Sequence, residues 1–263
     1  EFPTLKGVEI TTFHGHHVVL GVDEMVPWHE EGERADINDV AARFRENGAL
    51  FTLSHPYSIG DPVCTGCRFD PIPFDRAHVD LLEIWHRDWK GERSDNQSAY
   101  DLWNELWRDG YRPTAIGVRD WHNKDHEALL PGRLPTTAVE SGTTEQGDIL
   151  AALRRGACYV TTGPWMTFEM KSAGGESVAL GSTGAAGEGT LVGELNLVLP
   201  PREEGWSDLV AQLYRCGELC AEMPVENSGV IQMQSGSSGP GWYRAEIRQN
   251  GDPVVISNHI EMF

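Results

Sequence analysis

The chain has 263 residues, with 40 Asp and Glu against 21 Lys and Arg, and therefore carries a formal net charge of -19 at pH 7. Such a charge argues against partners that need a basic surface, namely nucleic acids and anionic membranes. No apolar stretch approaches the ~20 residues of a membrane span, and no signal peptide is visible, so we expect a soluble protein that acts on a small molecule, with the cytoplasm favoured.

Short apolar strands alternate with helical stretches from residue 1 to about residue 165. Strands are expected at residues 7–12 and 79–85, with a further apolar stretch at 15–21. Repeated strand–helix order indicates parallel strands joined by right-handed crossovers, so we predict an α/β layer or barrel. Three predicted helices each stop before a glycine and are followed by an apolar strand: 37–47 before 49–54, 95–109 before 113–118, and 146–155 before 158–161.

The sequence changes character after Pro164. Residues 173–193 are rich in Gly, Ser and Ala, which is typical of loops or a flexible joint. Short β-rich segments then predict an antiparallel sheet or small sandwich: 194–199, 209–214, 230–234, 242–247 and 254–257. We therefore expect a barrel over residues 1–170, a joint over 171–193 and a β-rich domain over 194–263.

Residues 117–122 (GVRDWH) place Asp120 and His122 one residue apart at the end of an apolar strand. Alternate side chains of a strand share a face, so the two can point at the same spot. A carboxylate and an imidazole together suit Zn²⁺, Mn²⁺ or Fe²⁺. Functional residues of parallel barrels gather at the carboxyl ends of strands, and three other strands carry compatible side chains at or near an end: Glu9 with His16, His55 before Pro56, and Glu83.

Glu9 follows an apolar pair and precedes Ile10, so we expect its side chain to be buried. A buried carboxylate is costly unless it is paired, which favours a metal ligand over the alternative of an ion pair with an Arg. His14 and His16 also form a His-x-His that could act with His55 and Asp120, but the sequence around Glu9 favours His16 alone. We assign the remaining histidines to the surface or to the surroundings of the ligands: His14, His17, His86 and His126.

The chain contains five cysteines, which excludes complete pairing within the chain. Cys64 with Cys67, and Cys216 with Cys220, are close enough in sequence for a structural zinc site or a disulfide. The spacing of the second pair is loose for zinc, so we favour free or locally paired thiols.

These segments together resemble the PHP (polymerase and histidinol phosphatase) metallohydrolases, and within them the CehA/McbA-like branch. The resemblance lies in the order of several short motifs: residues 7–12 with the following Gly15-His16, His55-Pro56, 81–85 (LLEIW) and Asp120-x-His122. Residues 153–164 (LRRGACYVTTGP) are similar to the segment that closes the barrel of that branch, and 243–247 and 256–258 to its β-rich tail.

The resemblance implies a distorted (β/α)7 barrel that carries up to three divalent metals, Zn, Mn or Fe. It implies that Glu9 bridges two metals and that His16 and His55 complete one of these sites. Asp120 would bind a second metal and His122 a third, while Glu83 faces the same pocket. The His-x-His that opens the family pattern does not precede Glu9, so we expect that N-terminal strands of the barrel are missing and that either an upstream segment or a reduced site accounts for this.

The predicted function is metal-dependent hydrolysis of a phosphoester by a metal-activated water. Arg119 could stabilise charge on the phosphoryl oxygens, because guanidinium groups match phosphate geometry. His122 or a neighbouring His could act as the general acid. Two alternatives stay open: hydrolysis of a carbamate or amide ester on the same fold, and a metal-binding or interaction module with impaired catalysis.

Overall fold

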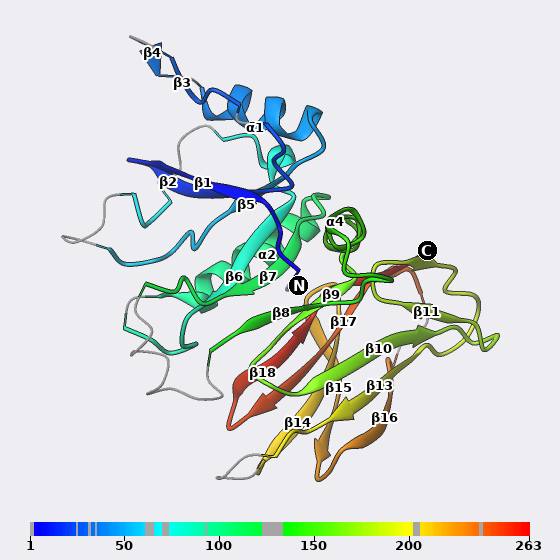
Figure 1. Ribbon diagram of the computed structural model, residues 1–263. Coiled ribbons are helices and arrows are strands. Elements are labelled where there is room, and N and C mark those ends of the chain that lie inside the picture. The colour runs from blue at the N-terminus through cyan, green and yellow to red at the C-terminus, as the bar shows by residue number, and fades with distance from the viewer. Residues whose placement is uncertain are drawn as a thin grey trace. The chain divides into compact units, whose positions relative to one another are not determined.

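The computed structural model of the chain describes residues 3–24, 26–30, 33–34, 36–60, 66–69, 74–92, 94–122, 134–201, 206–236 and 239–263. The chain forms two compact units, which are described separately below (Figure 1). Unit 1 comprises Glu1–Ile116 and Glu140–Arg154, and unit 2 comprises Gly117–Val139 and Arg155–Phe263. Within the described ranges, every helix is too short or too polar to cross a membrane.

Unit 1 is built on a five-stranded sheet in the order β1-β2-β5-β6-β7. β1 pairs antiparallel with β2 and β2 antiparallel with β5, whereas β5 and β6 are parallel. A separate two-stranded ribbon pairs β3 with β4. The strands are β1 (Gly7–Thr12), β2 (Gly15–Leu20), β3 (His29–Glu30), β4 (Glu33–Arg34), β5 (Leu50–Leu53), β6 (Leu81–His86) and β7 (Thr114–Val118).

The helices of unit 1 begin and end where local chemistry dictates. The carboxylate of Asp36 accepts the Asn38 N–H at the start of the first helix, and that of Asp95 accepts the Ser98 N–H at the start of the second. Glycines at positive φ, Gly48 at 82° and Gly110 at 93°, follow the two ends. The helices are α1 (Ile37–Glu46), α2 (Asn96–Arg108) and α4 (Gln146–Arg154), with a 3₁₀ turn at Arg76–His78.

The sheet of unit 1 is buried along its central strands and partly exposed at its edge strand β1. α1 packs against β5 over an apolar cluster that includes Ile10, Val19, Phe44 and Phe51, each at most 1% exposed. Every residue of β5 and β6 is buried, so these central strands are covered on both faces. Polar side chains that need solvent must therefore leave the sheet at strand ends or at an edge strand such as β1.

The predicted (β/α)7 barrel of α/β composition is wrong. Among the described residues there are three α-helices and nineteen strands, and the strands form several sheets. The prediction assumed parallel neighbours, whereas the segments at 7–12 and 15–20 are joined by only two residues, Phe13 and His14, which can connect only antiparallel strands. α1 likewise joins β2 to an antiparallel partner, so a helix between two strands did not indicate a parallel crossover here.

Unit 2 consists of two facing β-sheets, antiparallel except where β12 pairs parallel with β19. One sheet has the order β11-β10-β13-β16, and the other runs β12-β19-β17-β18-β9-β8 with β14 and β15 attached through β17. Its strands are β8 (Thr136–Val139), β9 (Cys158–Thr161), β10 (Trp165–Lys171), β11 (Ser177–Ala179), β12 (Thr183–Gly184), β13 (Val192–Val198), β14 (Leu209–Arg215), β15 (Glu218–Val225), β16 (Gly229–Gln234), β17 (Gly241–Gln249), β18 (Asp252–Ser257) and β19 (Ile260–Met262).

The core of unit 2 is a single apolar cluster fed by both layers. Phe168 of β10 and Leu195 of β13 meet Leu213 of β14 and Ile247 of β17 in it, as expected for a sandwich. Residues 171–193, for which loops were expected, contain β11 and β12.

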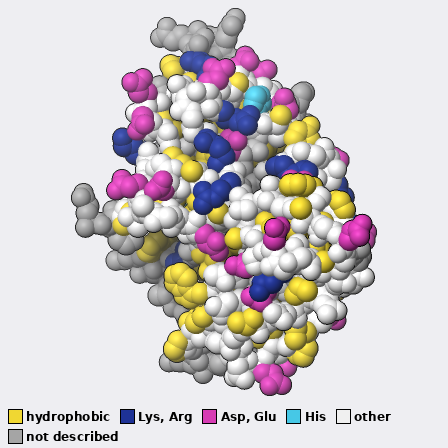
Figure 2. Space-filling view, turned by 90° about the vertical axis from the view of Figure 1, so that its right-hand side faces the viewer, with side chains coloured by type: hydrophobic (Ala, Val, Ile, Leu, Met, Phe, Trp, Pro, Cys, Tyr) yellow, Lys and Arg dark blue, Asp and Glu magenta, His cyan; other side chains and the backbone are white. Residues whose placement is uncertain are grey.

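On the face drawn in Figure 2, acidic side chains are spread out with Lys and Arg among them, so the negative charge is not collected into one patch there.

Candidate metal site

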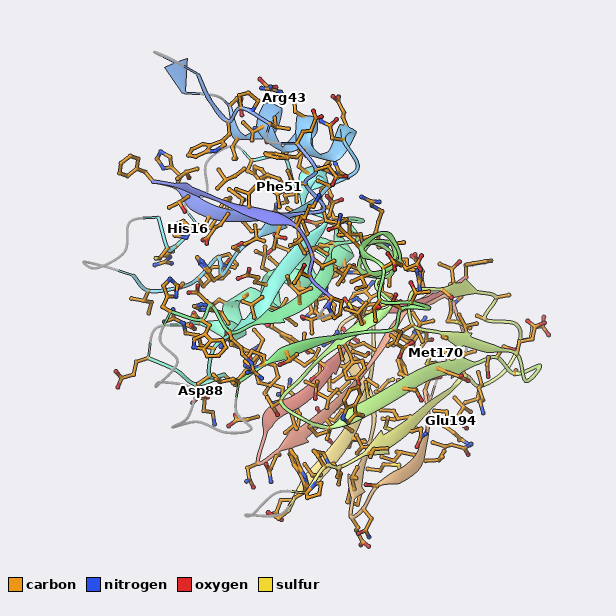
Figure 3. All side chains as sticks on the ribbon, in the orientation of Figure 1. His16, Arg43, Phe51, Asp88, Met170 and Glu194 are labelled. Carbon is orange, nitrogen blue, oxygen red and sulfur yellow. The ribbon has the colours of Figure 1, made fainter. Side chains whose placement is uncertain are left out.

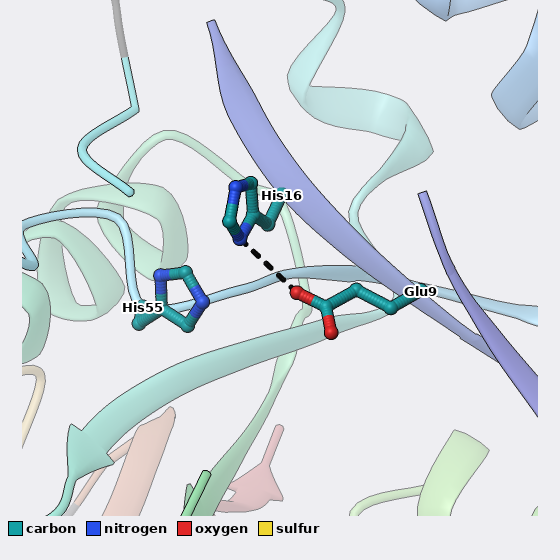
Figure 4. Close-up of side chains that lie close together, drawn as sticks. All are labelled: Glu9, His16 and His55. Atoms are coloured by element: carbon teal, nitrogen blue, oxygen red, sulfur yellow. Dashed lines mark ion pairs between the residues drawn. The ribbon is translucent and has the colours of Figure 1, made fainter. Parts of the chain in front are cut away.

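Glu9 and His16 lie on the same face of the β1–β2 hairpin. Thr11 is the register partner of His16, and Glu9 lies two residues before Thr11, so all three side chains share that face. The Nδ1 atom of His16 lies 3.1 Å from Oε1 of Glu9 (Figure 4). The hairpin register alone therefore brings a carboxylate and an imidazole together.

His55 joins this pair from the end of β5. Its neighbour Ser54 forms an antiparallel bridge with His16, in which the Ser54 N–H donates to the His16 carbonyl at 3.2 Å. The imidazole rings of His16 and His55 consequently lie edge to face, with their centroids 5.1 Å apart. One ligand atom from each of Glu9, His16 and His55 lies within 4.8 Å of the others, and this is the one such group among the described residues (Figure 4).

Two contacts hold His55 in an unusual conformation. Its φ of 28° is in the left-handed region, which is strained for a residue with a Cβ. Its backbone N–H donates to Oε2 of Glu83 at 2.8 Å, and its Nδ1–H donates to the carbonyl of Cys67 at 3.1 Å. Because a carbonyl only accepts, this second bond leaves Nε2 as the nitrogen with a lone pair for a metal.

Glu83 therefore supports the site by holding the backbone of His55. It was predicted as a metal ligand, but its carboxylate, in a residue only 3% exposed, lies outside the Glu9–His16–His55 group and accepts the His55 N–H. A buried carboxylate that accepts a backbone N–H stabilises a backbone conformation that would otherwise be costly. Its place on β6, next to β5 in the sheet, makes this contact.

The prediction that Glu9 is buried is wrong. Its side chain is 45% exposed, because β1 is an edge strand of the sheet and the buried side chain is that of the following residue, Ile10. His16 and His55, by contrast, are 8% and 7% exposed. The group thus has two buried imidazoles and one carboxylate that solvent can reach.

His17 lies on the opposite face of the same strand, although it is the next residue. Its register partner is Ile10 of the apolar cluster, and its ring packs on Phe51 and Phe74 with centroids 4.9 Å and 5.5 Å away. Burial lowers the pKa of His17 to about 4, despite its Nδ1 hydrogen bond to the Thr52 carbonyl. His17 is thus a neutral core residue, and Figure 3 shows His16 and Phe51 on different sides of the β2 ribbon.

His86, which was expected at the surface or around the ligands, is a buried neighbour of His55. It is the last residue of β6, is 3% exposed, and its ring centroid lies 5.0 Å from that of His55. Its Nδ1 lies 2.8 Å from Oγ of Ser94, and its backbone N–H donates to Oδ1 of Asn96. The signal was available: His86 ends a buried strand beside β5, just as His55 follows the end of β5.

Asp120, His122 and Arg119 belong to unit 2 and are described within it. Asp120 and His122 do approach each other: Nδ1 of His122 lies 3.3 Å from Oδ1 and 2.8 Å from the carbonyl of Asp120. The His122 side chain is 74% exposed, and Arg119 donates to Oγ1 of Thr136 at 3.1 Å. The predicted metal and catalytic roles of these three residues stay predictions.

The other expectations on histidines and cysteines divide as follows. His14 is outside the metal-capable group, although its backbone N–H is held by Oγ1 of Thr12 in the hairpin turn. Cys67 is disulfide-bonded, whereas Cys158, Cys216 and Cys220 are free. Cys64 and His126 lie outside the described residues.

The donor set fits a divalent transition metal. One carboxylate oxygen and two imidazole nitrogens are the ligands that Zn²⁺, Mn²⁺ and Fe²⁺ take in proteins, and a carbonyl that orients an imidazole is the usual partner of a metal-binding His. Comparison with known proteins finds no family model, no curated protein and no solved structure that matches this chain.

Proposed function

We propose that the chain is a metal-dependent hydrolase, with a phosphoester as the first substrate class to test. The observation that carries this proposal is the group formed by Glu9, His16 and His55, in which two imidazoles are buried and the carboxylate is open to solvent. A merely structural metal is usually enclosed by its protein ligands, whereas a catalytic one keeps a position for water or substrate. The resemblance of the motifs to PHP metallohydrolases supports the same chemistry.

In this proposal, three residues bind the metal and two others hold one of these ligands in place. A divalent ion held by Glu9, His16 and His55 would supply Lewis acidity and lower the pKa of a water molecule. His55 is fixed by Glu83 at its backbone and by the Cys67 carbonyl at Nδ1, so the direction of Nε2 is set before any ligand binds.

The solvent-exposed side of the site is the Glu9 side, since that side chain is 45% exposed while both imidazoles are buried. Substrate would therefore reach the site past β1. His86, next to His55, is placed to exchange a proton in the same region.

A carbamate or amide ester is the second candidate substrate class. The observation that favours it is electrostatic: 40 acidic against 21 basic side chains repel a phosphate dianion at long range, whereas a neutral ester is not repelled. The same donor set would serve attack on a carbonyl carbon.

The test combines metal content with turnover. We expect at least one Zn, Mn or Fe per chain, by plasma mass spectrometry of protein purified without chelator, and turnover of p-nitrophenyl phosphate or of an aryl carbamate. His55→Ala should lose both, and the matched control His14→Ala, in the same hairpin but outside the group, should keep both. Metal bound without turnover of either ester would refute the hydrolase and leave a metal-binding module. Full metal content in folded His55→Ala would refute the site.

A further inference from the structure

Residues 67–69, about twelve positions after His55, form backbone contacts with the chain at His55, Pro56 and Tyr57. Besides the Cys67 carbonyl bond to His55 Nδ1, the Phe69 N–H donates to the Pro56 carbonyl at 2.9 Å. Arg68 forms an antiparallel bridge with Tyr57. Three consecutive residues thus hold the chain that leads out of His55, and the Cys67 carbonyl reaches the imidazole as part of this seating.

Gly66 sets the position of that segment against the hairpin that carries Glu9 and His16. Its φ is 73°, and a Cβ at this position would lie 1.9 Å from the carbonyl oxygen of Thr12. A side chain would therefore force the two backbones apart. The same segment is thus in contact with both parts of the site, the hairpin through Gly66 and the end of β5 through Cys67.

Cys67 differs from the other described cysteines in its covalent state. It is disulfide-bonded, while the three cysteines of unit 2 are free. A disulfide limits the conformations open to the residues it joins. If the disulfide is opened, the backbone at Cys67 gains conformational freedom. Forming the hydrogen bond from His55 Nδ1 to the Cys67 carbonyl then costs more conformational entropy.

We propose that Cys67 is a positioning residue of the metal site and that its disulfide makes metal affinity depend on thiol redox state. This inference rests on the proposed function, because it concerns the same three ligands. A dithiol or a phosphine would open the bond: with a phosphine, phosphorus attacks one sulfur, the S–S bond breaks, and water supplies the phosphine-oxide oxygen and the two thiol protons. With Cys67 freed, the Nδ1 bond weakens and the Nε2 donor of His55 is less well directed.

The experiment compares Mn²⁺ binding by oxidised and reduced protein, followed by electron paramagnetic resonance of free Mn²⁺. The full chain is reduced with a phosphine, desalted without oxygen and titrated beside an untreated sample. Loss of an outer hydrogen-bonding partner typically weakens metal affinity about 10- to 100-fold. We expect a Kd increased at least ~10-fold on reduction, restored on reoxidation, with unchanged far-ultraviolet circular dichroism.

Variants separate positioning from general damage. Cys67→Ser should bind Mn²⁺ as weakly as the reduced wild type and should not respond to reductant. Cys216→Ser, which removes a free thiol of unit 2, should behave as the wild type in both states. Gly66→Ala displaces the same segment with the disulfide chemistry intact and should also weaken binding. If Cys67→Ser does not fold, the reduction of wild-type protein decides.

The outcomes are distinct. Equal affinity in both redox states overturns the inference and leaves the proposed function standing. Tighter binding on reduction, with a thiolate charge-transfer band when Co²⁺ is the probe, overturns it by making a cysteine a ligand. Absence of Mn²⁺ and Co²⁺ binding in either state overturns the proposed function and this inference with it.

Discussion

The sharpest quantitative prediction concerns His17, the imidazole that faces the core of unit 1. It is 2% exposed, lies against Phe51 and Phe74, and its pKa is lowered from 6.5 to about 4, mainly by burial. In the folded protein the ring stays neutral down to about pH 4, whereas in the unfolded chain it takes up a proton near pH 6.5. Between these values the unfolded state binds more protons, so acid favours unfolding through this residue.

The size of the effect follows from the shift. Each unit of pKa difference corresponds to about 1.4 kcal/mol, so the full difference between 6.5 and about 4 costs ~3 kcal/mol of unfolding free energy. The loss begins as the pH falls through 6.5 and is complete below about 4, and above 6.5 His17 contributes no pH dependence. Between pH 7 and pH 4.5 we expect ~2 kcal/mol from this group alone.

The assay is urea unfolding of chelated wild-type and His17→Phe protein at pH 7 and pH 4.5, with the slope m checked for constancy. At pH 7 the variant loses one hydrogen bond to Thr52, about 1 kcal/mol, and gains aromatic packing. On acidification the wild type should lose ~2 kcal/mol more than the variant. The control His14→Ala should follow the wild type. Equal losses in wild type and His17→Phe would refute the assignment of His17 as a neutral core residue.

Three further predictions test the contacts behind the site and in unit 2. His55→Gly should be ~1 kcal/mol more stable than His55→Ala in thermal or urea unfolding, because only the alanine keeps a Cβ at φ 28°; equal stability would contradict the strain. Glu83→Gln keeps an oxygen for the His55 N–H and should retain most metal affinity, whereas Glu83→Leu should weaken it about tenfold; equal loss in both variants would make the charge of Glu83 decisive. In unit 2, the carboxylate of Glu246 is fully buried, 2.8 Å from Arg244 Nε and 2.7 Å from the Arg248 guanidinium. Glu246→Leu should therefore lower the free energy of unfolding by ~3 to 5 kcal/mol, because it leaves buried guanidinium charge without its carboxylate. A loss below ~1 kcal/mol would show that water or rearrangement replaces the carboxylate.

The positions of regular elements could be predicted because they depend on local pattern. The helix expected at 37–47 is α1 at Ile37–Glu46, and that expected at 95–109 is α2 at Asn96–Arg108. An apolar stripe, an Asp at the start and a Gly after the end define each without reference to the rest of the chain. The strand at 7–12 is likewise confirmed as β1.

The direction of the strands, and the sheets that the strands form, could not be predicted in the same way. An apolar run has the same pattern whether its neighbour is parallel or antiparallel, and only the two-residue connection at Phe13 and His14 carried directional information. Strands of unit 2 such as β15, which has mostly exposed or half-buried residues, lack the apolar pattern on which the expectation rested.

The candidate site shows the same division between local and non-local information. The choice of His16 over His17 depends on which residue of β1 lies opposite each, and adjacent residues of a strand necessarily face opposite sides. Glu9 looked buried because its neighbours are apolar, but exposure is set by the place of β1 at the sheet edge. The bond from His55 Nδ1 to the Cys67 carbonyl joins two residues twelve positions apart, and neither belongs to a helix or strand, so no spacing rule could indicate it.

The backbone of unit 1 explains why chemistry collects where it does. β5 and β6 are buried along their whole length, so a side chain that binds solvent-borne ligands has to emerge where a strand ends and the backbone turns. Non-glycine residues at positive φ mark two of these turns, His55 after β5 at 28° and Arg87 after β6 at 56°. Each such conformation costs on the order of 1 kcal/mol, and at His55 a buried carboxylate opposes that cost directly by accepting the residue's own N–H. A buried carboxylate beside a strained backbone is a cost to folding, since an unstrained loop without the carboxylate would fold at lower cost. The pairing is accounted for if His55 must present Nε2 toward His16 and Glu9, which is why the strain at this turn is itself an argument for the metal site.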